Sequence, residues 1–81
     1  MRTESDLTEN VREVMAEAFG VDESDLPEEI SQQDYSGWSS LAHLTLLVAL
    51  EEKFGVSFST GEMTAMNSLP AVISVLKKHG V

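Results

Sequence analysis

The sequence predicts a small all-α bundle, and three observations support this fold class. Apolar residues recur at helical spacing in three separate stretches, about residues 6–19, 40–54 and 69–79. No two strand-like segments are present that could pair into a sheet. The chain has 81 residues, of which 42% are hydrophobic and none is cysteine, so we expect one domain over residues 1–81, stabilised by burial.

Acidic residues are concentrated in the first part of the chain. The formal net charge is -9, and eleven of the 14 acidic residues lie within residues 1–34, whereas residues 35–81 are balanced. Excess negative charge repels nucleic-acid phosphates and anionic membranes, so we expect neither as a partner. No long apolar run predicts a membrane span or a secretory signal, and we expect a cytoplasmic monomer.

The first predicted helix runs from about residue 6 to residue 19. Ser5 or Asp6 is expected to cap its start, and Gly20 is expected to end it. Its apolar face consists of Leu7, Val11, Val14, Met15 and Ala18. Three glutamates on the opposite face are interpreted as solvated surface.

A long loop is predicted between residues 21 and 38, because no periodicity survives there. Its large apolar residues are expected to pack it against the bundle, and they are Val21, Leu26, Ile30, Tyr35 and Trp38. Trp38 has a second interpretation, since a large aromatic side chain could instead stack on a ligand.

The second predicted helix, about residues 40–54, is apolar around roughly 220° of its circumference, about twice what a surface helix needs to face a core. One part of this arc consists of Leu46, Leu47, Leu50 and Phe54. The other part contains Leu41, Leu44 and Val48. Either the helix is buried centrally, or these three residues form a docking surface or line the mouth of a cargo pocket.

The last third of the chain is predicted to hold a short helix and a longer one. Residues 56–59 alternate like a strand but have no partner strand, so we interpret them as an extended connector. Ser59 or Thr60 is expected to cap a single helical turn. Ser68 is expected to cap the last helix, and Pro70 is compatible with that helix's first turn.

A serine-containing junction precedes the second helix. A serine at such a position lies beside unpaired backbone N–H groups and the positive end of the helix dipole, which favour an attached phosphate. Together with the pattern that follows it, Ser39-Ser40-Leu41 resembles the Asp-Ser-Leu motif of the acyl carrier protein family, the phosphopantetheine-binding carrier proteins, over about residues 6–79. The other matching residues are Leu44, Leu47, Leu50, Glu51, Glu52, Phe54, Gly55, Val56, Ser68 and Leu69.

The resemblance implies a small four-helix bundle of the acyl-carrier type, with a short third helix and a long loop between the first two. It implies 4'-phosphopantetheine, covalently attached from coenzyme A to Ser40, with Ser39 and Leu41 beside the attachment. Such a carrier holds acyl or aminoacyl intermediates as thioesters and is not itself an enzyme. Its partners would be a phosphopantetheinyl transferase, a loading ligase or transferase, and downstream synthase enzymes, as in fatty acid biosynthesis and lipid metabolism.

Two departures from the family pattern affect the interpretation. Ser39 stands where the family has aspartate, and it can cap the helix equally well but lacks the fixed charge beside Ser40. The exposed turns of the second helix carry fewer acids than in fatty-acid carriers, so docking should depend less on salt. This difference indicates a specialised biosynthetic pathway.

Two sets of residues are expected to contact partners and cargo. The partner-binding set is Leu41, Leu44, Val48, Glu51 and Glu52. The set that could surround a long acyl chain is Leu46, Leu50, Met63, Met66 and Ile73, although packing alone also explains these residues.

Other interpretations stand beside the carrier interpretation. The chain could be an unmodified interaction module that keeps the carrier fold and binds a partner helix. Ser40 and His43 are three residues apart and could touch, but no orienting group or oxyanion site is evident, so we expect no catalytic residue. No ligand spacing predicts a metal site. Ser36 and Ser39 are competing positions for a modification.

Overall fold

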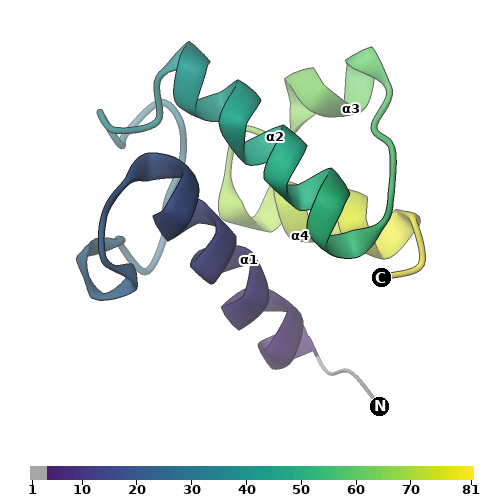
Figure 1. Ribbon diagram of the computed structural model, residues 1–81, viewed down its shortest axis with the longest axis horizontal. Helices are drawn as coiled ribbons and strands as arrows, with labels where there is room; N and C mark the ends of the chain where they lie inside the picture. Colours follow the sequence, from purple (N-terminus) through teal and green to yellow (C-terminus); the bar gives the residue numbers. More distant parts are fainter. Residues whose placement is uncertain (1–3) are drawn as a thin grey trace.

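Residues 4–81, which the computed structural model describes, form four α-helices and one 3-10 turn. The elements are α1 (Glu4–Phe19), η1 (Glu23–Asp25), α2 (Ser40–Phe54), α3 (Thr60–Ala65) and α4 (Leu69–Lys78). In Figure 1, α2 crosses the middle of the view, α1 runs below it, α4 passes behind it and α3 lies at the upper right. The predicted all-α bundle with a short third helix is confirmed.

The start of α1 differs from the prediction, whereas its end does not. Within the described residues the helix spans Glu4–Phe19 and includes both Ser5 and Asp6, so the expectation that one of these caps it is wrong. Helix α1 ends at Phe19, and Gly20 follows with a φ of 70°, a left-handed conformation that glycine adopts at little cost.

The core is built from apolar side chains of α1, α2, α4 and the loops. Helix α1 packs against both α2 and α4, and α3 packs against α4. No polar or charged residue is buried within the described residues, so stability rests on apolar burial. The buried residues are Leu7, Val11, Val14, Met15, Ala16, Leu26, Ile30, Trp38, Leu46, Leu47, Leu50, Phe58, Met66, Leu69, Val72, Ile73 and Leu76.

The long loop between α1 and α2 is packed onto the bundle by its apolar residues, as predicted. Leu26, Ile30 and Trp38 are buried, and Val21 and Tyr35 pack against the core. In Figure 1 this loop folds at the left end of the molecule, beside the start of α2. The loop therefore brings the chain to Ser40 along a defined path.

Polar contacts fix the same loop at two places. The Arg12 guanidinium on α1 donates to the carbonyl oxygens of Pro27, at 2.8 Å, and Leu26, at 3.1 Å. Farther along, an antiparallel bridge pairs Ser31 with Ser68 just before α4. These contacts satisfy backbone groups that a packed loop would otherwise leave unpaired.

Serine caps start the two C-terminal helices. The Ser59 hydroxyl accepts from the Glu62 amide, and the Glu62 carboxylate accepts from the Ser59 amide, so Ser59 and not Thr60 is the cap of α3. The Ser68 hydroxyl accepts from the Ala71 amide at the start of α4. Residues 56–59 are an extended connector, as expected.

Candidate functional site

Ser40 is the first residue of α2, and its side chain is exposed. Ser39 caps the helix: its hydroxyl accepts from the Ala42 amide at 3.1 Å, and its carbonyl accepts from the His43 amide at 2.8 Å. Within residues 4–81, the amides of Ser40 and Leu41 have no hydrogen-bond acceptor. An accessible hydroxyl thus lies beside two unpaired donors at the positive end of a helix dipole.

No acidic residue lies in the first turn of α2. An anion attached to Ser40 would therefore meet backbone donors and no opposing carboxylate within that turn. The hydroxyl of Ser39 does the capping that the aspartate of the family motif is expected to do, so the local helix start is preserved.

An aromatic cluster positions the backbone just before Ser40. The Phe19 ring, at the end of α1, lies 5.4 Å from the Trp38 ring and 5.7 Å from the Tyr35 ring between centroids. Gly37 lies close to Tyr35, since a Cβ on residue 37 would come within 2.7 Å of that ring. Trp38 is 2% exposed and packs in the core, so the interpretation of Trp38 as a fixing residue of the loop is confirmed.

His43 does not pair with Ser40. Its Nδ1 accepts from the Trp38 indole N–H at 2.9 Å, and its Nε2 lies 2.9 Å from the carbonyl oxygen of Met63. Both ring nitrogens are therefore engaged elsewhere, and the contact that a serine–histidine catalytic pair needs is not formed. The sequence predicts neither of these two partners of His43. The described residues contain no group of three or more metal-ligating side chains.

The outer face of α2 is apolar and exposed. Leu41 is 74% exposed, Leu44 60% and Val48 54%, whereas Leu46, Leu47 and Leu50 are buried on the other side. The interpretation of α2 as a centrally buried helix is therefore wrong, since Leu41, Leu44 and Val48 are exposed. A shallow hollow of about 410 Å³ follows this exposed face, lined by Leu44, Thr45, Val48, Ala49 and Glu52.

The two glutamates at the end of α2 have different environments. Glu51 accepts a hydrogen bond from the Phe58 amide at 2.8 Å and so fixes the connector that follows the helix. Glu52 is exposed and borders the hollow beside Leu44 and Val48. Of this predicted pair, Glu52 is the more accessible to a partner.

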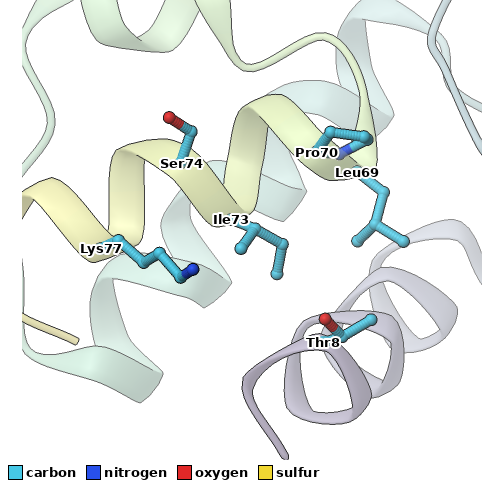
Figure 2. A pocket seen from close by; sticks show the side chains of 6 residues that line it. All are labelled: Thr8, Leu69, Pro70, Ile73, Ser74 and Lys77. Atoms are coloured by element: carbon cyan, nitrogen blue, oxygen red, sulfur yellow. The ribbon is translucent and has the colours of Figure 1, made fainter. Parts of the chain in front are cut away.

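The residues expected around an acyl chain do not share one open cavity. Leu46, Leu50 and Met66 are fully buried. Met63 lines a hollow of about 300 Å³ between α2 and α3, with Gln32, His43, Leu44, Leu47 and Thr64. Ile73 lines a different hollow of about 450 Å³ between α1 and α4, and in Figure 2 its side chain points toward the helix that carries Thr8.

Glu62 is a structural residue whose role sequence reasoning missed. Besides the Ser59 amide, its carboxylate contacts His79 Nε2 at 3.0 Å and Lys78 Nζ at 3.9 Å, both near the end of α4. Hydrogen bonding from the Ser59 amide, and then from His79, holds the pKa of Glu62 below its usual range. The Ser-x-x-Glu spacing of residues 59–62 is the signal that predicts half of this arrangement.

These features define a helical bundle with an accessible serine hydroxyl at the N-terminus of an apolar helix. The family model described as "Phosphopantetheine attachment site" matches residues 9–76. The chain belongs to this family, which confirms the resemblance to the acyl carrier proteins and gives 4'-phosphopantetheine as the prosthetic group. Proteins of this family are carriers that work with transferases and synthases. None of the helices in residues 4–81 combines the length and apolar character needed to cross a bilayer.

Proposed function

We propose that the chain carries 4'-phosphopantetheine on Ser40 and presents acyl or aminoacyl groups to partner enzymes, without catalysing a reaction itself. The observation that carries the proposal is the exposed Ser40 hydroxyl at the start of α2. The amides of Ser40 and Leu41 are free to donate to the phosphate, and Leu41 offers an apolar surface beside it. When bound, the prosthetic group supplies a tethered thiol that holds the cargo as a thioester and raises its effective concentration at each partner. Residues 1–81 would act as one cytoplasmic carrier domain and as a monomer.

The test is the intact mass after incubation with coenzyme A and a promiscuous phosphopantetheinyl transferase. The wild-type chain and Ser36→Ala are expected to gain one phosphopantetheine, and Ser40→Ala is expected to gain none. Ser36 is the matched control, because it is an exposed serine of the preceding loop. Modification of Ser40→Ala would refute the assignment to Ser40, and a wild-type chain that gains no mass would favour an unmodified module that binds a partner helix.

We propose that partner enzymes dock on the exposed apolar face of α2. Leu41, Leu44 and Val48 extend from the start of the helix along its outer side, and Glu52 lies at their edge. Apolar contact depends weakly on ionic strength, unlike the pairing of an acidic helix with a basic enzyme surface. This surface supports a dedicated role in a specialised pathway over general fatty acid biosynthesis. A steep loss of affinity for the transferase as salt rises would count against it.

Shelter for a long acyl chain is proposed among Leu46, Leu50, Met63, Met66 and Ile73. Because three of these residues are fully buried, a chain could reach them only if helices move apart. The hollow beside Met63 is the proposed entrance, because its α2 residues start at His43, about one helical turn after Ser40 in the sequence. Protection of a long-chain thioester from hydrolysis, relative to an acetyl thioester, measures this sheltering.

A further inference from the structure

A pair of hydrogen bonds joins the loop before Ser40 to α3 through one side chain of α2. The Trp38 indole N–H donates to His43 Nδ1 at 2.9 Å, and His43 Nε2 lies 2.9 Å from the Met63 carbonyl oxygen. We call this pair of bonds the His43 bridge. It connects three segments that are far apart in the sequence: the end of the long loop, the second turn of α2 and the short helix α3.

The chemistry of the two partners fixes the state of the imidazole. An indole N–H can only donate and a backbone carbonyl can only accept. His43 must therefore accept at Nδ1 and donate at Nε2, which makes it a neutral ring with its hydrogen on Nε2. Both hydrogen bonds depend on the same orientation of the imidazole ring. Displacement of either Trp38 or Met63 therefore also weakens the bond of His43 to the other residue.

Two residues of the His43 bridge lie on either side of the proposed attachment residue in the sequence. Trp38 lies two residues before Ser40 and His43 lies three residues after it, so their side-chain contact spans the start of α2. The two rings also pack together, with centroids 5.9 Å apart. The backbone of Ser40 is thus fixed from both sides by side chains that face the interior, while its own hydroxyl faces solvent.

Helix α3 depends on contacts with the rest of the molecule, among them those of Met63, which packs against the core. It spans six residues, none of which is buried, and its packing is mainly against α4. A helix this short is marginal without tertiary contacts. Its polar contacts with side chains of other elements are those of His43 with the Met63 carbonyl, and of His79 and Lys78 with the Glu62 carboxylate. His43 also lines the hollow between α2 and α3, so a group entering there would meet the bridge.

We infer that His43 is a positioning residue that couples the placement of α3 to the end of the loop that precedes Ser40. Movement of α3 away from α2 removes the acceptor at Met63, frees the imidazole and loosens the hold on Trp38. The use of this coupling to a carrier rests on the proposed function. Through it, a change in the hollow between α2 and α3 would alter the position of the attachment residue. The coupling itself belongs to the unmodified chain, so it can be tested whether or not Ser40 is modified.

The first test compares His43→Phe with His43→Gln by hydrogen exchange of the Trp38 indole N–H, followed by NMR on the unmodified chain. Loss of one hydrogen bond is expected to speed this exchange about five- to tenfold in His43→Phe, more than it speeds the core amides of α1 and α4. Glutamine has both an acceptor and a donor, so His43→Gln is expected to restore much of the protection.

The matched control is Leu76→Ala, which removes a fully buried side chain from α4, a helix that contributes no group to the His43 bridge. It is expected to speed exchange of the indole and of the core amides together. If His43→Phe gives that uniform pattern, or leaves the indole unchanged, the histidine only fills space and the inference is wrong. The same conclusion follows if glutamine restores nothing.

The second test disturbs α3 from its far side. Glu62→Gln weakens the cap of α3 and the contact of residue 62 with His79. The interactions of Ser59, Glu62 and His79 do not involve Trp38. With His43 present, this substitution is expected to speed exchange of the Trp38 indole, whereas in the His43→Phe background it should add little. Equal effects in both backgrounds, or none in either, would show that α3 and the loop are not coupled through His43. Mass labelling of Ser40 is scored separately, so its failure would refute only the proposed function.

Discussion

Helices α2 and α4 are both rich in apolar residues, but they use them differently. On α4 the apolar side chains form one buried face, and the opposite side carries polar groups such as Ser74 and Lys78. On α2 one set of leucines is buried and a second apolar set is exposed beside Ser40. Because the described core is complete without the exposed set, those residues contribute little to folding. The difference indicates that the apolar surplus of α2 serves contact with other molecules.

The largest expected effect is on stability, and it should separate the two helices. Leu76→Ala on α4 removes a fully buried side chain and is expected to lower the free energy of unfolding by about 2–5 kcal/mol. Val48→Ala on α2 truncates an exposed side chain and should change it by less than about 0.5 kcal/mol. Urea denaturation followed by circular dichroism measures both, and similar losses would mean that Val48 supports the fold.

The next effect is on binding, and it should appear on the exposed face of α2, where truncation has little effect on stability. Leu44→Ser is expected to weaken affinity for the phosphopantetheinyl transferase about tenfold or more, because Leu44 lies in the middle of the exposed apolar face. Glu52→Gln, at the edge of the same face, is the matched control and should change affinity only slightly. Titration calorimetry measures both. Equal affinities for Leu44→Ser and the wild type would show that the transferase does not dock on this apolar face.

Much of this arrangement was predictable from the sequence because it depends on local signals. Periodicity and capping residues give α2 its bounds, and Ser68 gives the start of α4. The same signals cannot show which part of the apolar arc of α2 is buried, because that depends on where α1 packs. Local signals also miss the acceptors of His43 and Arg12. These acceptors are the backbone carbonyls of Met63 and Pro27, which are distant in sequence, and a backbone carbonyl is present in every residue type.

A smaller effect is expected at the helix cap beside Ser40. Ser39→Ala removes the acceptor of the Ala42 amide and should lower the free energy of unfolding by about 1 kcal/mol. Ser39→Asp keeps that acceptor and adds a negative charge at the positive end of the helix dipole, so stability should be retained or slightly raised. If the transferase reads the charge of the family aspartate, Ser39→Asp should also be modified faster, which a time course of intact mass measures. An unchanged rate would show that the hydroxyl is sufficient.

The smallest effect concerns Glu62, whose carboxylate has a structural role that the exposed Glu52 of α2 lacks. Because its pKa is lowered by the Ser59 amide and by His79, the folded chain holds the ionised form more strongly than the unfolded chain does. The resulting stability is present above the ordinary glutamate pKa of about 4.3 and is lost as the pH falls through the lower folded value. Glu62→Gln is therefore expected to be less stable than the wild type at neutral pH and to lose less stability on acidification. Unfolding free energies measured against pH decide this, and parallel profiles for the wild type and Glu62→Gln would show that the carboxylate does not hold α3 to the end of α4.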